Sequence, residues 1–213
     1  NRHRLPRLFS LALEAEIEVP MVRRLVRDWR IAPASAADGR WPWPVRVRTL
    51  GRFEVLLDDA PLTLGRKVPK RLLELLKSIC ALGGQDVPLA RLADAMFPDQ
   101  DADVAEDSMR VSLQRLRKLL GSDTHVTLRD GRVSLNPATV WVDAVAFRQA
   151  VSGASSDDQT RDALSLYAGP LLADDEAVWA IGPRESLRDL FLRKAARLAE
   201  SDVSAGRWAP ALH

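Results

Sequence analysis

The chain has 213 residues, 46% of them hydrophobic and 28% charged, and a formal net charge of +2. This length and composition are typical of a globular protein with one large or two small hydrophobic cores. So small a net charge excludes nucleic-acid binding through overall charge, and any such binding needs a local cluster of arginine and lysine. The single cysteine excludes an intramolecular disulfide and favours a reducing compartment. Since no apolar run could span a bilayer and no signal peptide is found, we expect a cytoplasmic protein without a membrane partner.

The first 44 residues predict two helices followed by a linker. Within residues 6–30, apolar side chains recur at helical spacing; they are Val22, Leu25, Val26 and Trp29. The other side of this stretch carries arginines, which could contact DNA but more often form a solvated face; they are Arg23, Arg24, Arg27 and Arg30. Because the chain begins at Asn1 rather than Met, we expect residues 1–30 to end an upstream domain. The prolines of residues 31–44 predict a linker without regular structure.

Residues 45–96 predict a small sheet followed by two helices. Segments 45–48 and 53–57 alternate in polarity, and Asp58-Asp59 form a turn before residues 61–64, which indicates an antiparallel meander. From Val68 to Leu82 the apolar spacing becomes helical; the stripe consists of Leu72, Leu73, Leu76, Ile79 and Cys80. Cys80 is therefore expected to be a buried small side chain without a catalytic role. A second helix covers residues 89–96 and ends before Pro98.

Residues 105–135 predict a helix with a polar face and then a hairpin. The helix over 105–120 has an apolar stripe and ends at Gly121; the stripe is Met109, Leu113, Leu116 and Leu120. Its other face is polar or charged, with Arg117 at the edge; this face carries Arg110, Val111, Gln114, Arg115 and Lys118. Asp130-Gly131 predicts a tight turn between strands 126–129 and 132–135, which place Arg129 and Arg132 on the hairpin. A helix and hairpin of this kind have the shape of a major-groove reader with a wing.

The last part of the chain predicts mostly helices. Residues 137–158 read as a connector, and helices are expected over about 159–167 and 183–203, separated by a break at Gly169-Pro170. The apolar stripe of the second helix is Leu187, Leu190, Phe191 and Leu198. A further helix is expected after Gly206. Tryptophans beside helical turns are more often packing anchors than ligand contacts; they are Trp141, Trp179 and Trp208.

Residues 45–136 resemble the OmpR-type winged helix of bacterial SARP-like regulators, named after Streptomyces antibiotic regulatory proteins. The resemblance rests on residues 47–55, 69–76, 92–98 and 111–121. Residues 139–213 look like the start of the bacterial transcriptional activator domain that follows the winged helix in those proteins; the matching segments are 163–172, 179–180, 184–187 and 206–208.

The resemblance implies an α+β fold class. An OmpR-type winged helix, made of a β-meander, three helices and a C-terminal hairpin, would be followed by an all-α, TPR-like helical-repeat domain. The implied domains are a winged-helix DNA-binding domain over 45–136, a connector over 137–158, and a truncated activator domain over 159–213.

The resemblance also implies roles for single side chains. Arg115 would be the main base reader, and Val111 would face a thymine methyl or a sugar. Ser112, Arg117 and Lys118 would lie near phosphates, while Thr127 and Arg129 would serve the wing, with Arg129 reaching the minor groove. Residue chemistry agrees, because arginine pairs bidentately with guanine and Gln114 could pair with adenine. Glu106 and Asp107 depart from relatives that carry a basic residue at the start of this helix. The candidate DNA-binding set is Arg110, Val111, Ser112, Gln114, Arg115, Arg117, Lys118, Thr127, Arg129 and Arg132.

An enzyme is not expected, and neither a cofactor nor a metal is implied. His3, His125 and His213 are far apart, and no phosphate-binding glycine loop or nucleophile motif occurs. Residues 99–103 imitate the opening of a calcium loop, but the glycine and glutamate positions hold Val104 and Arg110.

Two classes of function remain. The first is a DNA-binding transcriptional regulator, expected to be an activator and a fragment of a larger multidomain signalling protein. Its partners would be double-stranded DNA and, through the helical repeat, the transcription machinery or a second copy. The second is a protein-interaction module whose winged helix docks on protein rather than on DNA. The arginines and the hairpin favour the first class, and the acidic start of the helix favours the second.

Overall fold

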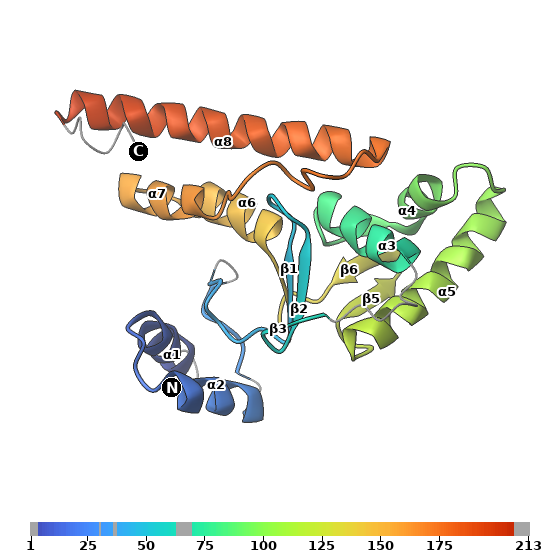
Figure 1. The fold of residues 1–213 in the computed structure, drawn as a ribbon, viewed down its shortest axis with the longest axis horizontal. Helices are drawn as coiled ribbons and strands as arrows, with labels where there is room; N and C mark the ends of the chain where they lie inside the picture. The colour runs from blue at the N-terminus through green and yellow to red at the C-terminus, as the bar shows by residue number, and fades with distance from the viewer. Residues whose placement is uncertain (1–3, 30, 36–37, 63–69, 207–213) are drawn as a thin grey trace.

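The computed structural model describes residues 4–29, 31–35, 38–62 and 70–206. A four-stranded sheet stands at the centre, with α3, α4, α5 and a hairpin on one side and α1 and α2 at the opposite end, while α8 lies across the top (Figure 1). The helices are α1 (Arg4–Glu14), α2 (Val19–Asp28), α3 (Lys70–Ala81), α4 (Leu89–Met96), α5 (Ala102–Leu120), α6 (Asp143–Gly153), α7 (Asp157–Ser165) and α8 (Val178–Ser204). The strands are β1 (Val45–Arg48), β2 (Glu54–Leu57), β3 (Ala60–Pro61), β4 (Val87–Pro88), β5 (Val126–Arg129), β6 (Arg132–Leu135) and β7 (Val140–Val142).

The central sheet has the order β3-β2-β1-β7. Strands β1, β2 and β3 form the predicted antiparallel meander, and the turn between β2 and β3 places Asp58 and Asp59 at φ 48° and 68°. Strand β7 joins parallel to β1, with Val45 opposite Val140. The sequence pattern did not predict this strand. Because β7 returns after the hairpin, it closes residues 45–142 into one unit.

Helices α3, α4 and α5 pack into one core beside the sheet. The predicted stripe of α5 is confirmed, since its four members are at most 2% exposed; they are Met109, Leu113, Leu116 and Leu120. In α3, Leu75 is buried, whereas the predicted Leu73 is only half-buried. Helix α3 contacts α4 and α5 as well as α6 and α8, so its buried face is wider than one stripe. Cys80 is buried as expected, and burial raises the pKa of its thiol.

Helices α1 and α2 form the predicted pair, and they share a second core with the segment that follows them. In α2, Val22 and Val26 are buried, but the prediction for Trp29 is wrong, because it is 59% exposed. The helix ends at Asp28, so Trp29 leaves the buried stripe. The described residues of 31–44 form no helix or strand, as predicted, yet Trp41 and Trp43 are only 2% and 1% exposed. This segment is therefore packed against the domain rather than free.

The arginines of α2 contact the turn between β2 and β3. Arg23 lies 3.3 Å and Arg27 3.1 Å from a carboxylate oxygen of Asp59, and Arg46 of β1 lies 3.4 Å from the other oxygen. Both arginine side chains stay more than a third exposed, as expected of a solvated face, but Asp59 also lies within ion-pair distance of both. Arg24 pairs with Asp28 of its own helix. Arg30 lies outside the described residues.

Helix α6 packs on β1, β7 and α3, α8 packs on α3 and α6, and α7 packs on α6 and α8. Buried residues of all three helices belong to the main core. Leu50 bridges to Leu171 in the loop after α7, and Lys77 of α3 forms a 2.9 Å ion pair with Asp175. The break at Gly169-Pro170 is confirmed. In α8, Leu187 and Leu198 are buried, whereas Leu190 and Phe191 are half-buried. The helix predicted after Gly206 lies outside the described residues, and so does Trp208. Within the described residues, every helix is too short or too polar to cross a bilayer.

The carboxylate of Asp143 joins the two halves of the molecule. It is 5% exposed and accepts hydrogen bonds from the backbone N–H groups of Thr49, Leu50 and Ala144 at 2.7–2.9 Å, and from the Thr49 hydroxyl at 2.7 Å. Burial raises the pKa of this carboxyl, although these hydrogen bonds oppose the effect. Asp143 therefore fixes the end of β1 to the start of α6.

Replacing Asp143 with Asn should lower the free energy of unfolding by about 1–3 kcal/mol, because an amide NH₂ would then face N–H donors that are left without an acceptor. Urea denaturation followed by circular dichroism measures the change. The control is Asp174→Asn at an exposed site. Equal stabilities of the two variants would show that the Asp143 hydrogen bonds contribute nothing specific.

Candidate nucleic-acid interface

The face of α5 opposite its buried stripe is open to solvent. Its exposed side chains are those that the sequence predicted; they are Arg110, Val111, Gln114, Arg115 and Lys118. Val111 is 49% exposed, which is unusual for an apolar residue on a helix with a well-buried stripe. Gly121 ends the helix at φ 87°, as predicted. Basic side chains in the last turns also suit the negative end of the helix dipole.

Charge on this face differs between the two ends of α5. At the N-terminal end, Arg110 pairs with Asp107 at 2.9 Å and with Glu106 at 3.2 Å. These two carboxylates therefore balance a cation of the same face. Further along, the side chains of Arg115 and Lys118 make no hydrogen bond or ion pair with any residue that the structure describes. Uncompensated positive charge is thus gathered in the second half of the helix.

Two other candidates on α5 have partners within the protein. The Nε of Arg117 donates to the carbonyl of Val126 at 2.7 Å, and the side chain is half-buried. The hydroxyl of Ser112 donates to the carbonyl of Ser108 at 2.8 Å, one turn earlier. Arg117 therefore connects α5 to the first residue of β5, a role that its place at the edge of the polar face did not reveal.

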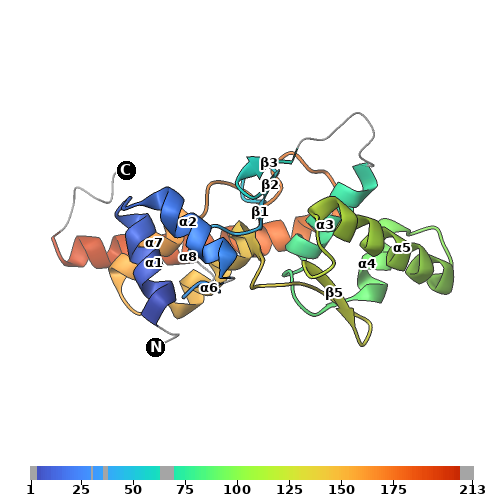
Figure 2. The same cartoon turned by 90° about the horizontal axis from the view of Figure 1, so that it is seen from below.

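Strands β5 and β6 form the predicted hairpin, with Asp130 at φ 49° and Gly131 at φ 68° in the turn. Positive φ at both positions is the geometry that favours the Asp-Gly pair. The hairpin projects from the body beside α5 and α4 (Figure 2). One side of it is directed into the core, where Val126, Val133 and Leu135 are at most 3% exposed. The other side, which carries Thr127, is at the surface.

Arg129 and Arg132 lie directly opposite each other beside the turn, and both are exposed. Arg132 donates to the carbonyl of Asp86 at 2.9 Å, and the Asp86 N–H donates to the Ser134 hydroxyl at 2.8 Å. These bonds anchor β6. The side chain of Arg129 has no hydrogen bond or ion pair with any other described residue. Like charges directly across a strand pair destabilise a hairpin, so an anion bound here would relieve the repulsion.

The histidine that the structure describes is held by contacts within the protein. His125 is buried, its Nδ1 lies 2.9 Å from the Thr139 hydroxyl, and burial lowers its pKa. His3 and His213 lie outside the described residues, so their relation to His125 stays untested. Among the residues that are described, no cluster of histidine, cysteine and carboxylate side chains could hold a metal ion.

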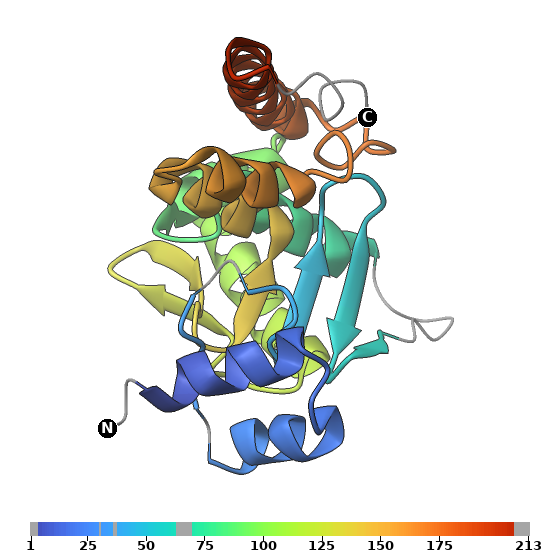
Figure 3. The ribbon, with the colours of Figure 1, turned by 90° about the vertical axis from the view of Figure 1, so that its left-hand side faces the viewer.

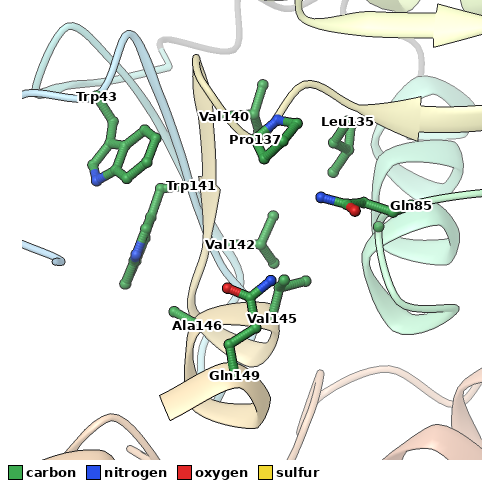
Figure 4. A pocket seen from close by; sticks show the side chains of 11 residues that line it. Trp43, Gln85, Leu135, Pro137, Val140, Trp141, Val142, Val145, Ala146 and Gln149 are labelled. Atoms are coloured by element: carbon green, nitrogen blue, oxygen red, sulfur yellow. The ribbon is translucent and has the colours of Figure 1, made fainter. Parts of the chain in front are cut away.

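One pocket is lined by Trp43, Trp141, Val142, Gln85 and Gln149 (Figure 4). Trp141 belongs to β7, and Trp43 lies on the same side of that strand. Its cavity of about 30 Å³ has room for roughly one water molecule. Trp141 is 7% exposed and belongs to the second core. It is therefore a packing anchor, as predicted. Trp179 is half-buried, and Trp208 lies outside the described residues.

Comparisons with known proteins identify a matching family model and a solved structure with a similar fold. Residues 142–213 match the family model described as the bacterial transcriptional activator domain. No curated protein matches the sequence. Among solved structures, the chain is similar to Mycobacterium tuberculosis EmbR in complex with a low affinity phosphopeptide, with a TM-score of 0.61 and 17% identity. The similarity covers 78% of this chain and 47% of that one, so this chain spans about half of its length. At this identity the likeness shows a shared fold.

Arg117 and its neighbour Arg115 should differ in their effect on stability. Arg117→Ala removes the bond to Val126 and should lower the free energy of unfolding by about 1 kcal/mol. Arg115→Ala, at an exposed site on the same helix, should change it by less than about 0.5 kcal/mol. Thermal and urea unfolding of both variants provide the measurement. If Arg115→Ala were the more destabilising, the assignment of Arg117 as the structural arginine would be wrong.

Proposed function

We propose that this chain is the DNA-binding part of a bacterial transcriptional activator of the SARP kind. In this proposal, residues 45–136 form an OmpR-type winged helix, with α5 as the recognition helix and the β5–β6 hairpin as the wing. The observation that carries it is a group of three cations, Arg115, Lys118 and Arg129, whose side chains have no hydrogen bond or ion pair with a described residue. They lie on two elements joined by the bond between Arg117 and Val126.

The chemistry of α5 suits the major groove, which is wide enough to admit a helix. Arg115 can donate two hydrogen bonds to a guanine, and Gln114 can pair with an adenine. Val111 offers an exposed methyl surface to a thymine. Lys118 carries a point charge suited to a phosphate. Base reading and phosphate contact are thus provided on one helix face.

The wing and the edges of α5 have supporting roles. Arg129 can reach a minor groove or a phosphate from the hairpin tip, with Thr127 on the same strand face. Arg132 and Arg117 hold the wing through the carbonyls of Asp86 and Val126. A phosphate contact by Arg132 or Arg117 uses the guanidinium nitrogens that do not donate to these two carbonyls. Arg110 and Ser112 are secondary candidates because both already have partners.

The match of residues 142–213 to the activator domain supports an activating role. The fold shared with EmbR supports the same class of protein. The helices after β7 would then form the start of a helical-repeat domain that contacts the transcription machinery or a second copy. A regulator of this kind would act in the cytoplasm, where its DNA lies. The phosphopeptide in the EmbR structure is a ligand of that protein, and nothing in the α5 face requires one here.

The alternative is a winged helix that docks on protein. The acidic residues that favoured it, Glu106 and Asp107, both pair with Arg110, which offsets one of their two negative charges. Salt dependence separates the alternatives, because DNA binding releases counterions and weakens steeply with salt. Selection from random duplex DNA, followed by binding measured at several salt concentrations, tests the proposal directly.

Arg115→Ala should weaken binding to the selected site by about 1–3 kcal/mol, the range for a bidentate base contact. The variant should lose the ability to distinguish between bases mainly at one base pair of the site. Fluorescence anisotropy with labelled duplexes mutated at each position measures both effects. A folded variant that binds the site as the parent does would remove Arg115 from the reading set.

Arg129→Ala should weaken binding to all duplex sequences alike. It should also reduce the slope of log K against log salt by about one unit, because one phosphate contact is lost. The matched control is Arg148→Ala, an exposed arginine on α6, which should leave the slope unchanged. An intact slope, with the change confined to one base position, would make Arg129 a base reader.

A further inference from the structure

Asp107 lies on the exposed face of α5, opposite the buried stripe. Its side chain is 81% exposed, and Val111, Gln114 and Lys118 follow it at helical spacing on the same line. Asp107 and Gln114 are seven residues apart, so they differ by only about 20° around the helix axis. Helix α5 stands at one edge of the molecule (Figure 1), and α1 and α2 lie at the other end, which is in the foreground of Figure 3. This line of side chains is therefore open to a partner.

Local stability does not account for a carboxylate at position 107. The helix begins at Ala102, and its dipole favours carboxylates only within the first turn, where Asp103 lies. Aspartate is also among the weaker helix formers. The ion pair between Asp107 and Arg110 is exposed, and pairs at this spacing contribute little to stability. A contact with a bound partner accounts for the carboxylate better.

One oxygen of the Asp107 carboxylate is bound within the helix. Its Oδ1 accepts a hydrogen bond from Nη1 of Arg110 at 2.9 Å, whereas its Oδ2 accepts none from any other residue in the described part of the chain. Arg110 also donates to Glu106 at 3.2 Å, so the guanidinium is fixed between two carboxylates. The bond to Arg110 thus restricts the rotation of the Asp107 side chain and leaves one oxygen able to accept. The positive charge of Arg110 also lowers the repulsion between this carboxylate and nearby phosphates.

The four bases present different donors and acceptors in the major groove. Cytosine presents its N4 amino group, which is a donor. Guanine presents two acceptors, and thymine presents one acceptor and a methyl group, so neither offers a donor to a carboxylate. Adenine presents a donor beside the acceptor N7, which suits an amide better than a group that can only accept. A carboxylate on a helix in the major groove therefore favours cytosine.

We propose that Asp107 reads a cytosine in the major groove, with the free oxygen of its carboxylate accepting a hydrogen bond from the N4 amino group. This inference rests on the proposed DNA binding by α5, and it adds a base to that function. Recognition helices contact bases with their N-terminal residues, and Asp107 lies in the first half of α5. Asp107 and Arg115 are eight residues apart, about 12 Å along the helix axis, so they contact different base pairs.

The substitution Asp107→Asn tests the assigned base, because asparagine has nearly the same size and pairs with adenine. At one base pair of the selected site, the parent chain should prefer cytosine to adenine by about fivefold or more, the lower end of the cost of a mismatched base pair. In the variant, the preferred base at this position should change to adenine. Fluorescence anisotropy measures the affinities of the 213-residue chain and of the variant for duplexes that carry each of the four bases at each position.

The matched control is Glu106→Gln, which removes the same charge from the same group of ion pairs. The Glu106 side chain is only 34% exposed and lies about 100° further around the helix than Asp107. This control should strengthen binding to all sequences alike, because one negative charge near the phosphates is lost. If Asp107→Asn also gave a uniform gain in affinity without a change of preferred base, the carboxylate would only repel phosphate and the inference would be wrong.

The same measurements separate this inference from the proposed function. If Arg115→Ala changes the base preference at one position and Asp107→Asn changes it at none, α5 still reads DNA and only the role of Asp107 is wrong. If the parent chain shows no salt-dependent binding to any duplex, the proposed function fails and the cytosine contact fails with it. Circular dichroism of each variant checks that the helices are intact.

Discussion

The carboxylate of Asp143 is the contact on which the arrangement of this protein depends. It receives the N–H groups at the end of β1 and at the start of α6, and it lies in a buried site. The groups that donate hydrogen bonds to this carboxylate are neutral N–H and O–H groups. Their dipoles, and not a positively charged side chain, stabilise its negative charge. A buried carboxylate is costly unless its lone pairs are used. The parallel pairing of β7 with β1 brings the donors and the acceptor together.

Helix α3 connects the part of the structure around Asp143 to the helices that carry the candidate DNA-binding surface. One side of it contacts α4 and α5, and the other contacts α6 and α8. The ion pair between Lys77 and Asp175 and the bridge between Leu50 and Leu171 hold the later helices against the same core. The helices after β7 are thus fixed to the body that carries α5 and the hairpin. A contact made by those helices would be made at a set distance from any DNA bound to α5.

Although the net charge is small, some arginines form ion pairs within the described part of the protein and other cations there do not. Arg23, Arg27 and Arg46 converge on Asp59, and Arg110 is balanced by Glu106 and Asp107. Arg115, Lys118 and Arg129 have no such balance among the described residues. Positive charge is thus available beside the hairpin even though acidic and basic residues are nearly equal in number. A polyanion would meet these side chains without first breaking an internal ion pair.

Local patterns in the sequence determined the elements of this protein. The stripe of α5, its end at Gly121 and the Asp-Gly turn of the hairpin follow from short-range spacing and from the backbone preferences of glycine and aspartate. The exposed face of α5 follows from the same spacing, because a helix that buries one stripe must present the rest. The residues that remain free on it, Arg115 and Lys118, were therefore visible in the sequence.

Tertiary structure decided which side chains have partners on other elements. Arg117 looked like another surface arginine, but its distance to Val126 depends on how the hairpin folds back on α5. Trp41 and Trp43 looked like part of a linker, and they are buried because α1, α2 and Trp141 surround them. Strand β7 and the role of Asp143 depend on residues more than 90 positions apart in the chain. Such contacts have no periodicity to reveal them, because they are set by the packing of whole elements and not by the spacing within one.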